Sequence, residues 1–228
     1  GFTVGGEANG SLNVIGGGAY NRISGWTCNL IAGGAWNQIK SGATSWSTII
    51  NGDQNIIENK GGLRTSMFNH IGNGIQNYIT SHLPLSNQIF NGALNRIVGR
   101  AVSIDGSDPY NPTNSYNTIL NGYYNSIVIS GNSEANSQGY NTILNGTQNS
   151  AGTRSDYSTI LGGQFNWVNA DGSAILAGLR HHVNANTAAV LAGYNHHMAP
   201  TAVNSSILAG QDIYAYSADT SYTNLLNV

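Results

Sequence analysis

Two acidic residues in a long irregular segment come nearest to a catalytic pair. Asp105 and Asp108 lie three residues apart in VGRAVSIDGSDPYNPTNSY, the segment 98–116. Glycoside hydrolysis needs two carboxylates about 5 to 10 Å apart across a cleft, and a three-residue spacing in a loop does not establish that separation. No phosphate-binding loop, nucleophile elbow or metalloprotease motif accompanies them. We therefore expect no catalytic residue and no cofactor, with a glycan depolymerase as the alternative.

Two histidine pairs recur near the carboxyl end of the chain. His181 and His196 lie 15 residues apart, each is followed by a second histidine, and each stands where most other repeats have asparagine. Imidazole is a common metal ligand, so both are weak candidates for a metal site. No carboxylate or cysteine recurs at the same spacing, and histidine can replace the hydrogen bonds of asparagine. We expect structural histidines and no metal.

The segments that interrupt the repeat are rich in Tyr, Ser, Gly and Asn, a blend that antibody loops use for rigid aromatic contact and adaptable hydrogen bonding. Two of them flank a single repeat and are expected to form one lateral binding patch with it. The expected ligand-binding residues are Asp105, Asp108, Tyr110, Tyr116, Tyr123, Tyr124 and Tyr140. The alternative is that these segments are solvated loops, which cost a repeat fold little stability.

One phrase recurs along the chain: Asn or Ser, any residue, Ile, a variable and a small residue, Gly, two variable residues, Asn, any residue, and Ile or Val. Clear copies are NVIGGGAYNRI (13–23), NTILNGYYNSI (117–127) and STILGGQFNWV (158–168). Successive copies are as little as 15 residues apart, which accommodates two short strands and their turns but leaves no room for helices. Each copy is therefore predicted to be one β-coil.

Each shared position has a predicted role in the coil. The isoleucines point inward because side chains alternate along a strand. The glycine provides a positive φ or a close approach at the corner. The asparagine three residues later is predicted to bond backbone groups and to stack as an amide ladder. These structural asparagines are Asn21, Asn37, Asn55, Asn77, Asn95, Asn125, Asn149 and Asn166.

Composition narrows the function classes. Charged residues make up 8% of the chain, the formal net charge is −2 and 40% of residues are hydrophobic, although 32 asparagines and 30 glycines are present. Such a chain is too apolar for disorder and lacks the basic stripe of a nucleic-acid-binding protein. Cys28, alone, cannot form an intrachain disulfide. No run approaches the roughly 18 apolar residues of a membrane span, so no membrane insertion is expected.

The predicted fold is all-β: a repetitive β-solenoid or β-roll of about 12 short coils in one domain, 1–215, followed by an extension, 216–228. Lateral insertions are expected at 58–68, 98–116 and 128–140. A two-strand coil buries little by itself, and very thin coils usually need extra chains. We therefore expect an intertwined or side-by-side homotrimer.

The repeat resembles the β-roll heads of trimeric autotransporter adhesins and the glycine-rich segments of phage tail fibres, over residues 5–215. Its longer, more variable units, with no coiled-coil stalk or anchor, favour the tail fibre. The resemblance implies a homotrimer in a virion tail or at an extracellular or cell surface, with receptor binding and host attachment to a bacterial surface glycan. Alternatives are a polysaccharide-degrading tailspike and a purely structural fibre segment.

Overall fold

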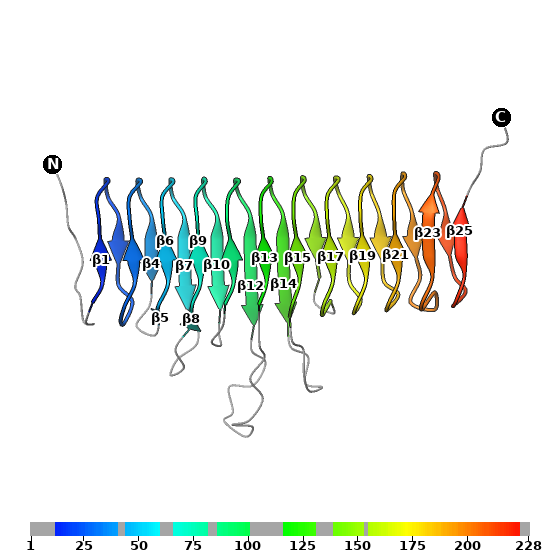
Figure 1. Ribbon diagram of the computed structural model, residues 1–228, viewed down its shortest axis with the longest axis horizontal. Helices are drawn as coiled ribbons and strands as arrows, with labels where there is room; N and C mark the ends of the chain where they lie inside the picture. The colour runs from blue at the N-terminus through cyan, green and yellow to red at the C-terminus, as the bar shows by residue number, and fades with distance from the viewer. Residues whose placement is uncertain are drawn as a thin grey trace, which may run out of the picture.

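The protein is a rod built from stacked β-coils, as Figure 1 shows. The computed structural model describes residues 12–40, 44–59, 66–81, 86–100, 116–130, 139–152 and 155–223. All the regular secondary structure within these ranges is β-strand, which confirms the predicted all-β solenoid. The same residues include no helix that is long and apolar enough to cross a membrane.

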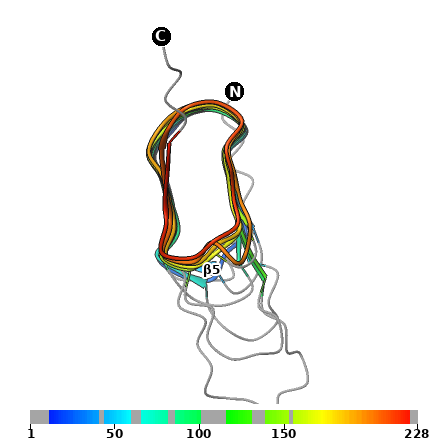
Figure 2. The same cartoon turned by 90° about the vertical axis from the view of Figure 1, so that its right-hand side faces the viewer.

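Two parallel sheets form the long walls of the rod, which has an oblong cross-section (Figure 2). The first sheet contains β1 (Val14–Ile15), β3 (Leu30–Ile31), β6 (Thr48–Ile49), β9 (His70–Ile71), β11 (Gln88–Ile89), β13 (Thr118–Ile119), β15 (Thr142–Ile143), β17 (Thr159–Ile160), β19 (Ala174–Ile175), β21 (Ala189–Val190), β23 (Ser206–Ala209) and β25 (Ser221–Thr223). The second contains β2 (Arg22–Ile23), β4 (Gln38–Lys40), β7 (Ile56–Asn59), β10 (Tyr78–Ser81), β12 (Arg96–Arg100), β14 (Ser126–Ser130), β16 (Ser150–Ala151), β18 (Trp167–Val168), β20 (His182–Val183), β22 (His197–Met198) and β24 (Tyr214–Ala215). A small third sheet pairs β5 (Thr44–Ser45) with β8 (Ser66–Met67).

The two short ends of the cross-section differ. At the glycine edge, the shared glycines turn the chain from a first-sheet strand into a second-sheet strand. At the opposite edge, called the insert edge, the chain returns from the second sheet to the first, and most of each predicted insertion, 60–65, 101–115 and 131–138, lies outside the described residues. Every coil thus exposes two flat faces and two narrow edges.

The core consists of two columns of aliphatic side chains, one contributed by each sheet, that lie between the two sheets. Ile119 lies in register with Ile143 in the next coil, and Ile127 is matched by Ala151. The predicted inward isoleucines Ile119, Ile143, Ile160, Ile175 and Ile207 are all 0% exposed. Because one chain closes this interior by itself, burial of the core does not require the homotrimer, which stays a prediction.

The corner glycines have the backbone that the repeat predicts. The eleven shared glycines have φ between +85° and +132°. A Cβ atom on Gly163 would also lie 2.1 Å from the carbonyl oxygen of Gly178 in the next coil. Both the conformation and the close stacking therefore require glycine at this corner.

A second left-handed residue occurs two positions after each corner glycine, at a position for which the repeat phrase predicts no special conformation. Tyr124 (φ 56°), Gln148 (φ 55°) and Arg180 (φ 60°) are examples. Residues before the insert-edge corner behave likewise, including Tyr157 (φ 56°) and Thr187 (φ 55°). This conformation costs a side-chain-bearing residue roughly 1 to 2 kcal/mol, so the hydrogen bonds that follow it must hold it in place.

The predicted boundaries of two insertions and of the C-terminal extension need correction. The insertions were expected to begin at 98 and 128, but β12 and β14 continue to Arg100 and Ser130 and pair with each other in register. The extension 216–228 was expected to lie beyond the solenoid, yet β25 pairs with β23 and continues the first sheet to Thr223. Where extended backbone lies beside a neighbouring strand, the two form a parallel pair even though the sequence no longer matches the repeat phrase.

Candidate functional site

The predicted asparagine ladder is present at the glycine edge. The Asn37 side chain donates to the carbonyl oxygens of Gly33 (3.1 Å) and Gly52 (2.9 Å), and its own backbone N–H donates to Oδ1 of Asn21 (3.0 Å). Asn55 repeats the pattern one coil further along. Each buried asparagine side chain thus satisfies backbone groups of its own turn and of the next coil, and its own backbone N–H is satisfied by the asparagine of the preceding coil, so these residues are structural.

A second ladder at the insert edge was not predicted. Asn29 accepts the backbone N–H of Ser47 through Oδ1, and Asn117 accepts that of Asn141 in the same way, both at 3.0 Å. These are the Asn or Ser residues at the start of each repeat copy, and they are buried. The sequence signal existed, since that position is Asn or Ser in most copies.

His181 and His196 continue the glycine-edge ladder in place of asparagine. Their rings stack 4.7 Å apart, 1% exposed each, and Nδ1 of His181 accepts the backbone N–H of His196 (3.3 Å). Burial, with the nearby His196, lowers the pKa of His181 from 6.5 to about 4, while backbone carbonyls partly oppose the change. No group of three potential metal ligands occurs in the described part of the chain. The neutral pair therefore serves the ladder.

The structure brings two of the predicted ligand-binding residues together. Tyr116 and Tyr140 stack at the insert edge with ring centroids 5.1 Å apart, and Tyr157, which was not predicted, extends the row at 4.8 Å. Three further predicted residues, Asp105, Asp108 and Tyr110, lie outside the described residues. The inner faces of the stacked rings cover one another, so this row presents mainly ring edges to a ligand.

Tyr123 and Tyr124 do not join that row. They lie at the glycine edge, immediately after Gly122, with their rings perpendicular at 4.7 Å. The single lateral patch expected from the sequence is therefore wrong for these two residues. Strand β13 spans the first wall between Tyr116 and Tyr123, so the two tyrosine groups occupy opposite edges of the rod.

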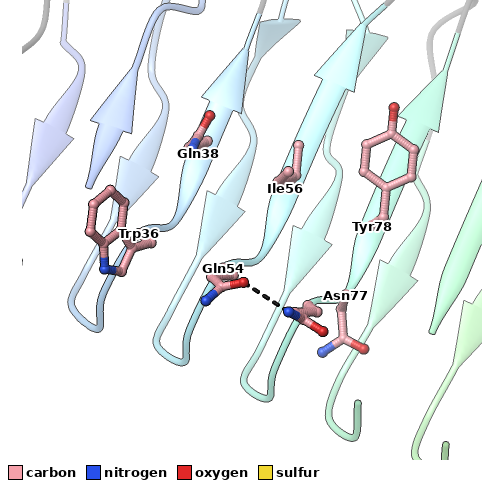
Figure 3. Close-up of a pocket in the computed structure, with 7 residues that line it drawn as sticks. Trp36, Gln38, Gln54, Ile56, Asn77 and Tyr78 are labelled. Carbon is pink, nitrogen blue, oxygen red and sulfur yellow. Dashed lines mark hydrogen bonds between the residues drawn. The ribbon is translucent and has the colours of Figure 1, made fainter. Parts of the chain in front are cut away.

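A groove of about 590 Å³ lies where the glycine edge meets the second sheet, shown in Figure 3. It crosses three consecutive coils. Its lining residues are Trp36, Gln38, Gln54, Ile56, Gln76, Asn77 and Tyr78. Their arrangement follows from the coil: the left-handed corner residues form one column of the groove, and the outward residues of β4, β7 and β10 form the column beside it.

The groove combines amides with aromatic rings and has no charged lining residue. Nε2 of Gln76 donates to Oε1 of Gln54 across one coil at 2.8 Å, as the dashed line in Figure 3 marks. Trp36 is half exposed and stacks on Tyr20 with centroids 4.2 Å apart. At the far side, the Tyr78 hydroxyl donates to Glu58 at 2.5 Å. Such a surface offers hydroxyl-binding amides and apolar ring faces together.

The groove was not predicted from the sequence. Alignment of the repeats places Trp36, Gln54 and Gln76 in one column, so the amide-rich run was available in the sequence. The neighbouring column of Gln38, Ile56 and Tyr78 has no common residue type, and only the register of β4, β7 and β10 brings it alongside.

The fold and groove define a class, a parallel β-solenoid with a neutral surface groove. Known proteins add nothing more specific: no protein-family model matches the chain, and a search of curated proteins finds no significant relative.

Proposed function

We propose that this protein is a non-enzymatic attachment rod that binds a neutral surface glycan in the groove between Trp36 and Tyr78. The observation that carries the proposal is the lining itself: amides and aromatic rings, without a charged side chain, across three coils. Sugars present hydroxyl groups to amides and apolar C–H faces to aromatic rings, whose flat surfaces supply contact area at little conformational cost.

The groove suits a chain of sugars better than an isolated small molecule. It lies open along the rod axis, and its residues repeat from coil to coil at the spacing of parallel strands, about 4.8 Å. A ligand that extends along the rod can therefore contact Trp36, Gln54 and Gln76 in turn. Weak contacts of this kind gain strength through multivalency, because linked sites raise the effective concentration.

The repeat resemblance makes a phage tail fibre, or another extracellular fibre segment, the proposed setting, with a bacterial surface glycan as receptor and a homotrimer as the assembly. A homotrimer would present three grooves to one cell surface. Glycan degradation is the alternative activity. The groove lining supplies no carboxylate pair of the kind that glycoside hydrolysis uses.

Binding to a panel of immobilised capsular and lipopolysaccharide O-chain glycans tests the proposal. Trp36→Ala is expected to weaken binding to the selected glycan about tenfold, which corresponds to the roughly 1.4 kcal/mol of an aromatic contact. Phe165→Ala is the matched control, because Phe165 has the same backbone conformation (φ 55° against 56°) and exposure (48% against 49%) but lies far from the groove.

The outcomes separate the alternatives. Equal loss in both variants would mean that the corner aromatics matter only for stability. Binding by neither the native chain nor the variants to any neutral glycan would overturn the proposal. Release of reducing ends from the bound glycan would establish the depolymerase instead.

A further inference from the structure

The outer face of the first sheet has an unusual composition. The residues that flank the inward aliphatic side chain of each strand point outward, and from β1 to β25 none of them is Lys, Arg, Asp or Glu. The corresponding face of the second sheet includes Arg22, Lys40, Glu58 and Arg96. A soluble surface normally mixes charges over such a distance, so the uncharged wall differs from the rest of the molecule.

A column of partly or fully exposed leucines runs along the part of this wall from β13 to β23, one residue after the inward aliphatic side chain of each strand. The leucine column consists of Leu120, Leu144, Leu161, Leu176, Leu191 and Leu208. Backbone hydrogen bonds keep it in register; for example, the N–H of Leu161 donates to Ile175 and that of Leu176 to Val190, both at 2.9 Å. Leu176 remains 40% exposed and Leu208 44%.

At β19 and β21 the residues on both sides of the leucine column are alanines, whose side chains are shorter than leucine. Ala174 and Ala189 lie on one side, and Ala177 and Ala192 on the other. A ridge beside shallow channels is a shape that packs against a second surface of the same kind. Contiguous apolar surface of this extent commonly marks a protein interface.

We propose that the first-sheet face is the surface through which copies of this chain associate side by side. The wall is about 50 Å long and 10 Å wide, from 12 strands about 4.8 Å apart and three residues across. The wall therefore offers about 500 Å² of surface on each chain, whereas a standard protein–protein interface buries roughly 800 Å² on each partner. Only a partner that follows the rod along its full length approaches the required area.

A second copy of the chain is that partner. Its leucines recur with the same coil spacing, so each contact formed in one coil can recur in the next, whereas a globular partner would touch only a few coils. The surface carries no charge that a face-to-face pairing would leave buried and unpaired. The groove lies at the glycine edge and on the second sheet, so association leaves it open and does not depend on the proposed glycan binding.

Solution mass tests the inference. At micromolar concentration, sedimentation equilibrium of the native chain should report at least twice the protomer mass of 24.0 kDa. The double variant Leu176→Glu and Leu191→Glu should sediment at the protomer mass, because it places charges in the interface. The control is Trp167→Glu, a residue of the second sheet whose exposure (43%) is close to that of Leu176 (40%), and this change should leave the assembly intact.

Stability measurements keep the test decisive. Far-UV circular dichroism and the melting curve must show that the double variant is folded; otherwise Leu176→Thr and Leu191→Thr replace it, since threonine already occupies first-sheet strands such as β15 and β17. A native chain at the protomer mass would overturn the inference, as would a folded double variant that still associates. A dimer or a trimer that only the first-sheet variants dissociate would support it.

Discussion

The asparagine ladder allows one prediction to be worked from individual bonds. In Asn125→Ala, the backbone N–H of Asn149 loses its acceptor, Oδ1 of Asn125 at 3.0 Å. The backbone carbonyl of Asn121 loses the side-chain amide of Asn125 as a donor at 3.2 Å, and the carbonyl of Gly146 loses the same amide at 3.0 Å. Gly146 keeps the backbone N–H of Tyr123 as a donor, so two backbone groups bear most of the loss.

A buried donor or acceptor without a partner costs about 1 to 3 kcal/mol, so Asn125→Ala should lower the free energy of unfolding by about 2 to 4 kcal/mol. Ser126→Ala is the control, because Ser126 is the next residue and points outward from β14. Urea unfolding followed by circular dichroism measures both variants. Coils contact only their neighbours and can open locally, so hydrogen exchange at the Asn149 amide should also accelerate.

Two results would refute this reasoning. One is a loss of stability in Asn125→Ala no greater than in Ser126→Ala. The other is an unchanged exchange rate at Asn149, which would mean that the ladder bond does not protect that amide. Either result would mean that the hydrogen bonds of Asn125 do not hold Tyr124 in its left-handed conformation.

Two further predictions concern the same edge. The lowered pKa of His181 means that its neutral form is favoured in the fold. The free energy of unfolding should therefore be highest above pH 6.5, decrease by up to about 3 kcal/mol as the pH drops towards 4, and level off below pH 4. Urea unfolding at a series of pH values measures this profile, and the double variant His181→Asn and His196→Asn should flatten it. In thermal unfolding, Gly163→Ala should destabilise the protein by more than 1 kcal/mol, because the φ of Gly163 is +97° and the added Cβ would meet the carbonyl oxygen of Gly178. Gly162→Ala is the control and should be nearly neutral, because open space surrounds Gly162. Equal effects of the two changes would contradict the conclusion that the corner requires glycine.

The repeat predicted those parts of the fold that depend on one residue type. Ile143 in its strand, Gly146 at the corner and Asn149 after it each do what the spacing indicated, because a narrow stacked coil accepts few other side chains at these positions. The left-handed residue between them, Gln148, left no signal. Its side chain points into solvent, so many residue types can occupy it, and only the fixed backbone is common to the copies.

The candidate site was less predictable for a related reason. Tyr116 and Tyr140 proved to be neighbours because both precede a first-sheet strand. The prediction placed Tyr123 in the same patch as Tyr116 because the two residues are close in sequence. Strand β13 lies between them, however, and it carries the chain from the insert edge to the glycine edge. The groove depends on register between coils of unequal length, and the insertions hide that register until the repeats are aligned residue by residue.

The left-handed corner column has a consequence for how such a surface can change. Its members at the glycine edge are Tyr20, Trp36, Gln54, Gln76, Leu94, Tyr124, Gln148, Phe165, Arg180, Asn195 and Asp212. Aromatic, amide, aliphatic, cationic and anionic side chains all occur there on the same backbone, held by the buried residue that follows. The column is in effect a row of exchangeable positions about 4.8 Å apart. The chemistry of this surface can therefore change one coil at a time while the interior stays the same.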